Sequence, residues 1–115
     1  MTNPAIEAFV QEASDILETL EDQLLELEGS HDTSQVDAVF RALHTIKGSG
    51  SMFGFTKLSQ FTHHFETAFD LIREGKLEVD AKLIDLSLKA RDTMRRFVDL
   101  GGIRRRQISC RTRLR

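Results

Sequence analysis

Apolar residues return at steps of three and four along four long stretches of the chain. This spacing is typical of α-helices that bury one face, because residues three and four apart lie on the same side of a helix. The stretches cover residues 4–28, 34–51, 56–75 and 80–101. Strict alternation of apolar and polar residues does not persist anywhere, so no β-strand is expected. The pattern predicts an all-α protein.

Polar residues and glycines mark the ends of the predicted helices. Side chains that can accept a hydrogen bond from a first-turn amide precede three of the helices, and the expected N-caps are Asn3, Thr56 and Asp80. Pro4 suits the first helical position. Glycine often follows the last helical residue, and the predicted stops are Gly29, Gly75 and the pair Gly101 and Gly102.

Short connections join these helices, and short loops place consecutive helices antiparallel. The sequence therefore predicts an antiparallel up-down four-helix bundle, formed as one domain by residues 1–102. The stretch "MFGF", residues 52–55, is expected to be a tight and partly buried connection. Residues 103–115 are expected to be an arginine-rich tail, disordered or foreign to the native chain. A fifth helix in that extra C-terminal segment is an open alternative.

Charge is distributed unevenly along the 115 residues. The last 13 residues hold six arginines and no acid, whereas residues 1–102 hold 18 acidic against 10 basic side chains. Because phosphates repel such an acidic body, we do not expect it to bind nucleic acid. Cys110 is the single cysteine, so neither an internal disulfide nor a thiolate metal site is predicted. No apolar run approaches a membrane span and no secretory signal begins the chain, which favours a cytoplasmic protein that does not bind membranes.

One segment, "HTIKGSGSMFGF" at residues 44–55, breaks the helical pattern with two early glycines. Each glycine inside a helix costs roughly 1 kcal/mol relative to alanine. The segment is not a nucleotide-binding loop, because the GxxxxGK[ST] motif is absent and Phe53 stands where the third glycine of GxGxxG is required. On a helical wheel with Val36 set at zero, His44 lies at about 80°, at the margin of the apolar stripe. Gly48, one turn later, leaves this imidazole uncovered, and Lys47 places a cation beside it.

An accessible neutral imidazole can act as a nucleophile towards phosphorus, and a carboxylate at its second nitrogen would fix its tautomer. Glu66 lies at the same margin of the third helix and can reach His44 if the two helices pack antiparallel. His63 shares that edge. The pair His63 and Glu66 does not make a di-iron pattern, which needs Glu-x-x-His twice, so no metal site is predicted. In the alternative without chemistry, His44 is a boundary histidine and the glycines belong to a fraying helix end.

The segment "FRALHTIKGSGSMFGFTKLSQFTHHFETAFD", residues 40–70, closely resembles the histidine phosphotransfer (HPt) domain at the N-terminus of CheA-type chemotaxis histidine kinases. The resemblance lies in His-x-Ile-Lys-Gly, then Phe-Gly-Phe, then His-x-x-Glu, and continues more weakly from about residue 6 to residue 100. It implies a helical bundle whose histidine accepts a phosphoryl group from the kinase's ATP-binding domain. The group then passes to an aspartate of a response regulator.

Residue by residue, the resemblance implies that His44 is the phosphoacceptor and that Glu66 holds its other ring nitrogen. Lys47 and His63 correspond to polar neighbours in that site, and Gly48 to the glycine that opens access. The implied partners are a kinase catalytic domain, which uses the magnesium and ATP, and a receiver domain. No cofactor is expected in this chain, which would be a substrate and carrier and not an enzyme on its own.

The sequence departs from the family after residue 102, where a CheA kinase continues into further domains. Without dimerisation helices we expect a monomer. Three alternatives stay open: a stand-alone phosphorelay HPt protein, a helical interaction module without chemistry, and binding of anionic partners through the arginine-rich tail.

Overall fold

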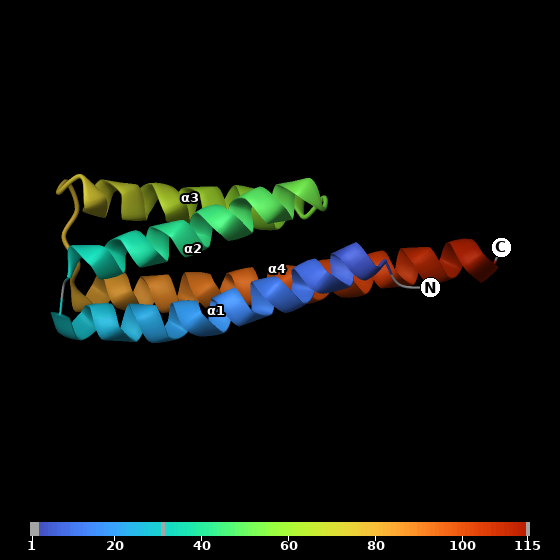
Figure 1. The fold of residues 1–115 in the computed structure, drawn as a ribbon, viewed down its shortest axis with the longest axis horizontal. Coiled ribbons are helices and arrows are strands. Elements are labelled where there is room, and N and C mark those ends of the chain that lie inside the picture. Colours follow the sequence, from blue (N-terminus) through green and yellow to red (C-terminus); the bar gives the residue numbers. More distant parts are fainter. Residues whose placement is uncertain (1–2, 31, 115) are drawn as a thin grey trace.

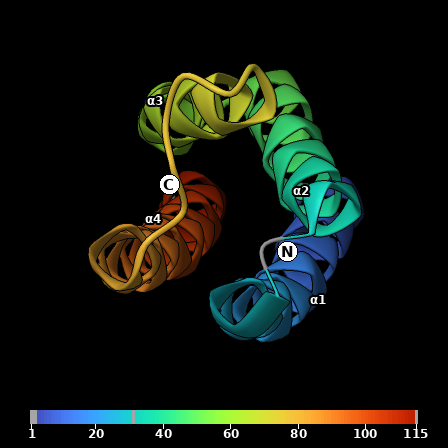
Figure 2. The same ribbon diagram turned by 90° about the vertical axis from the view of Figure 1, so that its left-hand side faces the viewer.

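The computed structural model describes the backbone of residues 3–30 and 32–114, and the side chains of residues 3–29 and 32–101. Four helices are present: α1 (Pro4–Ser30), α2 (Thr33–Met52), α3 (Thr56–Arg73) and α4 (Ala81–Leu114). They run up and down along one long axis (Figure 1), and seen from one end they follow one another around a common interior (Figure 2). No strand occurs in the described backbone. The predicted antiparallel four-helix bundle is therefore confirmed.

Three helices begin at acidic or amide side chains that bind first-turn amides. Asn3 accepts a hydrogen bond from the amide of residue 5 at 2.9 Å, and Asp80 accepts one from residue 83 at 2.7 Å, as the sequence predicted. Asp32 caps α2 by accepting from the amide of Ser34 at 3.0 Å. The predicted cap of α3 is wrong, because Thr56 is the first helical residue and the cap position belongs to Phe55, which makes no side-chain cap bond.

The connection between α2 and α3 is held by aromatic packing instead of a polar cap. The ring of Phe9 in α1 lies 4.8 Å from that of Phe55 and 5.5 Å from that of Phe53, measured between centroids. Between them Gly54 adopts a φ of 81°, a conformation that side-chain-bearing residues rarely tolerate. Phe55 is buried and Phe53 half-buried. The predicted tight, partly buried connection is confirmed.

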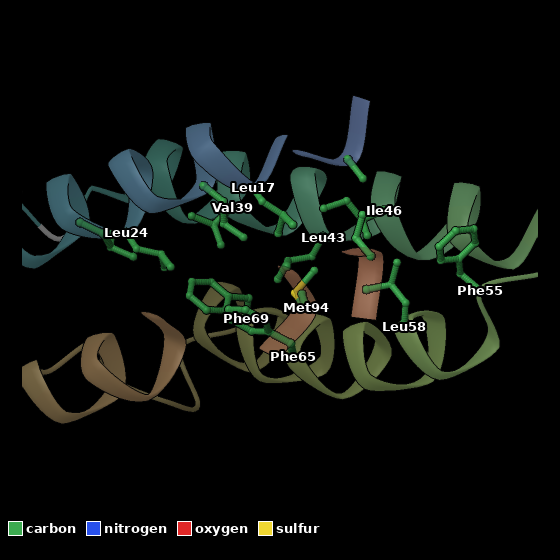
Figure 3. Close-up of a cluster of buried hydrophobic side chains, with 14 of the residues drawn as sticks. Leu17, Leu24, Val39, Leu43, Ile46, Phe55, Leu58, Phe65, Phe69 and Met94 are labelled. Carbon is green, nitrogen blue, oxygen red and sulfur yellow. The ribbon is translucent and has the colours of Figure 1, made fainter. Parts of the chain in front are cut away.

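The core runs along the interior of the bundle and draws on all four helices (Figure 3). Each helix contributes apolar residues from the face that the sequence pattern marked. Fully buried side chains from the four helices include Leu17, Leu20, Leu24, Leu43, Ile46, Leu58, Phe69, Ile84 and Met94. Burial of a leucine or phenylalanine side chain stabilises the fold by about 1.5–3 kcal/mol, so this core fixes how α2 lies against α3.

The fourth helix is longer than the sequence pattern predicted. Gly101 and Gly102 do not end it, because α4 continues to Leu114. Gly101 has a packing reason to be glycine: a Cβ there would lie 2.7 Å from Cε2 and 2.8 Å from Cδ2 of Phe55. The arginines beyond it are good helix formers. The side chains of residues 103–115 lie outside the described residues. That this segment is a tail distinct from the domain therefore stays a prediction.

Candidate functional site

His44 stands on α2 between core residues and yet faces outward. Its neighbours Leu43 and Ile46 are fully buried, whereas 66 % of the His44 side chain is exposed. This follows from the helical pattern, which places His44 just outside the stripe that packs against α3. Although His44 lies at the margin of the buried stripe, its imidazole is largely exposed to solvent.

Glu66 lies opposite on α3, which packs antiparallel beside α2 (Figure 1). Only 5 % of the residue is exposed, although it carries a carboxylate. Its two oxygens have different partners on α2: Oε2 lies 2.7 Å from Nδ1 of His44, and Oε1 lies 2.7 Å from Nζ of Lys47. The wheel-based prediction that Glu66 reaches His44 is thus confirmed as a contact. A buried carboxylate is tolerated here because both oxygens are paired.

Opposing effects set the pKa of the Glu66 carboxyl. Burial raises this pKa, because it disfavours the charged form, while the hydrogen bonds from Lys47 and His44 and the attraction to their charges lower it. The lowering effects prevail, so the pKa of Glu66 lies below its ordinary value of 4.5. Glu66 is therefore ionised at neutral pH and offers only acceptors.

The tautomer of His44 follows from this ionised partner. A carboxylate cannot donate a hydrogen bond, so Nδ1 of His44 must carry the proton in the 2.7 Å contact with Glu66. In the neutral imidazole the lone pair then belongs to Nε2. Since most of the ring is exposed, Nε2 is the atom that an electrophile from outside can approach.

His63 and Gly48 lie next to this pair without bonding to it. Nδ1 of His63 is 3.7 Å from Oε1 of Glu66, which is too long for a hydrogen bond, and its side chain is 60 % exposed. Gly48 follows His44 by one turn, and a Cβ at this position would meet nothing within 4 Å. The backbone beside the imidazole is therefore bare, as the sequence predicted.

An open hollow of about 480 Å³ adjoins the imidazole. It is lined by Phe40, Arg41, His44, Thr45, Lys47 and Glu66. Phe40 and Arg41 are not among the site residues that the sequence predicted. Both precede His44 by one helical turn, at i−4 and i−3, and this spacing alone could have identified them. Within the described residues no group of three or more histidine, cysteine or acidic side chains could hold a metal ion.

The arrangement can perform one kind of chemistry well. In its neutral form the imidazole presents the Nε2 lone pair to solvent, while Nδ1 lies against an ionised carboxylate and the Lys47 ammonium lies within one turn. The carboxylate compensates the positive charge that develops on the ring when Nε2 attacks an electrophile. An antiparallel helical bundle with an exposed histidine held in this way fits the class of histidine phosphocarrier domains.

The chain belongs to the Hpt domain family, whose sequence profile matches residues 5–100. The chemotaxis protein CheA of Borreliella burgdorferi is 38 % identical over 93 residues, which cover 80 % of this chain and 11 % of the relative. The chain thus spans a small part of the curated relatives that it matches.

Two solved structures have the same fold. The CheA phosphotransferase domain from Thermotoga maritima is 34 % identical, with a TM-score of 0.77, and the match covers 82 % of this chain and 90 % of that one. The phosphorylated P1 domain of CheA3, in complex with CheY6 from R. sphaeroides, is 25 % identical with a TM-score of 0.81. That match covers 88 % of this chain and 80 % of the other.

Proposed function

We propose that this chain is the phosphocarrier domain of a CheA-type histidine kinase and that His44 carries the phosphoryl group. One observation carries the proposal: Nδ1 of the exposed His44 is bound to buried Glu66, which leaves Nε2 as the open nucleophile. The likeness to a phosphorylated P1 domain in complex with CheY6 supports it. Glu66 is the positioning carboxylate, and Lys47 keeps it ionised.

Each transfer is a displacement at phosphorus. The Nε2 lone pair of His44 attacks the γ-phosphorus of ATP held with magnesium by a separate kinase catalytic domain, and the bond to the leaving ADP oxygen breaks. Nδ1 keeps its proton, and Glu66 offsets the charge on the imidazolium. In the second step a carboxylate oxygen of a receiver-domain aspartate attacks the same phosphorus. The N–P bond breaks and neutral His44 returns.

The chain itself is then a substrate and carrier and needs no cofactor of its own. The GxxxxGK[ST] motif is absent from its 115 residues, and the hollow beside His44 is open to a large partner. Gly48 keeps that approach free of side chains. Among the described residues no helix is long and apolar enough to cross a membrane. We place the domain in the cytoplasm, as a monomer when isolated, where kinase and receiver domains can reach it.

The proposal is tested by mixing the chain with the catalytic domain of a CheA-type kinase and magnesium ATP. We expect one acid-labile, alkali-stable phosphate, located on His44 by mass spectrometry. His44→Gln should abolish the label and leave the helical circular dichroism spectrum unchanged. His64→Gln is the matched control, since His64 is an exposed histidine on α3, and it should be labelled normally. Labelling that persists in His44→Gln would refute the assignment.

A further inference from the structure

The imidazole of His44 has a second neighbour besides Glu66. The ring of Phe40, one turn earlier on α2, lies nearly parallel to it, with 6.3 Å between centroids and 15° between planes. Aromatic rings at this separation attract one another in offset geometries. The hydrogen bond from Nδ1 holds one atom of the imidazole and leaves the ring a limited pivot about its Cβ–Cγ bond. A flat neighbour such as Phe40 restricts this pivot.

Phe40 is itself held from α3. The guanidinium carbon of Arg73 lies 4.2 Å from the centroid of the Phe40 ring, which is a cation–π contact. Two carboxylates orient that guanidinium: Nε lies 2.9 Å from Asp37 and Nη1 lies 3.6 Å from Asp70. Asp37 precedes Phe40 by three residues, whereas His44 follows it by four. The arginine therefore approaches Phe40 from the side of Asp37, and the imidazole lies on the side towards the other end of α2.

We propose that Phe40 and Arg73 are positioning residues for phosphotransfer, with Arg73 fixing the Phe40 ring and Phe40 fixing the plane of the His44 imidazole. This inference rests on the proposed function of His44. Glu66 and Phe40 together set the direction in which Nε2 points, one through a hydrogen bond and the other through a stacked ring. An in-line attack on phosphorus depends on that direction, because small misplacements of a reacting atom lower rates strongly. Arg73 does not line the hollow beside His44, so in this proposal it acts through Phe40.

The arrangement makes a specific kinetic prediction. Phosphorylation of the full chain is followed with magnesium ATP and a CheA-type catalytic domain, at varied concentrations of the chain. Phe40→Leu should lower kcat about tenfold and leave KM within about twofold, because the partner still docks while the imidazole is misdirected. Phe40→Tyr keeps the ring and should restore kcat. Arg73→Gln should lower kcat about threefold.

A double-mutant cycle separates an indirect role of Arg73 from an independent one. If Arg73 acts through Phe40, Arg73→Gln should have no further effect in the Phe40→Leu background. Arg96→Gln is the matched control for lost charge, because Arg96 is exposed on α4 and has no ion pair among the described residues. An equal loss of kcat in both backgrounds would overturn the proposal. A raised KM with unchanged kcat in Phe40→Leu would also overturn it, since Phe40 would then be a docking contact.

A measurement without the kinase distinguishes failure of this inference from failure of the proposed function. The ring protons of His44 lie beside the face of Phe40, so their NMR chemical shifts report the stacking directly. We expect Arg73→Gln and Asp37→Asn, which both loosen the guanidinium, to move these shifts towards those of Phe40→Leu. If the chemical shifts do not move in either variant, the positioning role of Phe40 and Arg73 is overturned, even if His44 is phosphorylated normally. If the wild-type chain is not labelled, the carrier function fails while the shifts still decide the positioning.

Discussion

At the scale of single residues the site depends on the carboxylate of Glu66. It is buried, and its oxygens each bind one cationic or proton-donating partner at 2.7 Å. A carboxylate in this position determines the tautomer of His44 and, in the proposed transfer, offsets the positive charge that develops on the ring. A glutamine amide would have the shape of this side chain without its charge.

Glu66→Gln should therefore lower the rate of His44 labelling about 100-fold, within the range that positioned proton-holding groups contribute. The glutamine keeps the volume of Glu66 but can present its amide to His44 in either sense, so the tautomer is no longer fixed. The measurement is the initial rate of phosphate incorporation with a CheA-type catalytic domain. Glu78→Gln, at an exposed carboxylate in the loop before α4, is the control and should retain the full rate. An unchanged rate in Glu66→Gln would remove Glu66 from the site.

The lowered pKa of Glu66 also predicts how stability depends on pH. Because the folded state holds this carboxyl below its ordinary pKa of 4.5, the unfolded chain binds its proton first as the pH falls. The contribution of Glu66 to the free energy of unfolding is thus complete above about pH 4.5 and is lost as the pH falls through the folded-state pKa. Urea unfolding of wild type and Glu66→Gln between pH 7 and 3 measures this. The stability of wild type relative to the variant should decrease below about pH 4.5, and a constant difference would contradict the ionised, paired state of Glu66.

At the scale of the helices, Gly48 and Gly101 show how different surroundings can account for a glycine inside a helix. Gly48 lies inside α2 with open space around it, whereas Gly101 lies inside α4 against the ring of Phe55. The sequence pattern treated both as breaks in a helix. In the structure both are helical, and they differ in their surroundings: the ring of Phe55 lies against Gly101, whereas a Cβ at Gly48 would meet nothing within 4 Å.

The different surroundings of Gly48 and Gly101 predict opposite effects of a glycine-to-alanine substitution on stability. Gly101→Ala should destabilise the bundle by about 1–3 kcal/mol, the usual cost of overpacking, because its Cβ would lie 2.7 Å from a ring carbon of buried Phe55. Gly48→Ala should stabilise it by up to about 1 kcal/mol through helix propensity alone. Denaturant unfolding of both variants gives the comparison. Equal effects at the two positions would show that Phe55 moves aside and that the close contact is not a constraint.

The sequence could predict features that depend on spacing within one helix, but not contacts between helices. Periodicity located the four helices, and the wheel brought His44 and Glu66 to facing margins, because both depend on spacing along one helix. The packing of Gly101 against Phe55 and of Arg73 against Phe40 joins residues on different helices. Spacing within a helix carries no information on such contacts. This is why the end of α4 was mispredicted and why Phe40 was not among the predicted site residues.

At the scale of the whole molecule the bundle is a rod with extents of 54 × 20 × 20 Å. Its described core reaches from Phe9 in α1 to Val98 in α4. The site lies at the outer surface of α2 and α3, beside that core, and the His44 imidazole faces outward. Partners can therefore dock on His44 without disturbing the packing that holds it.

This separation predicts that residues 103–115 are dispensable for phosphotransfer. A chain ending at residue 102 keeps every described core residue, including Phe55 with its neighbour Gly101, so it should fold with an unchanged circular dichroism spectrum and accept phosphate on His44 at the wild-type rate. The six arginines of the removed segment are the basis for any binding to polyanions, because counterion release scales with the cations brought to phosphates. Binding of heparin or single-stranded DNA at low salt should accordingly be lost in the shortened chain, which retains 18 acidic against 10 basic residues. If the shortened chain folds but is no longer labelled, the segment takes part in docking the kinase, and the carrier would need more of the chain than the bundle alone.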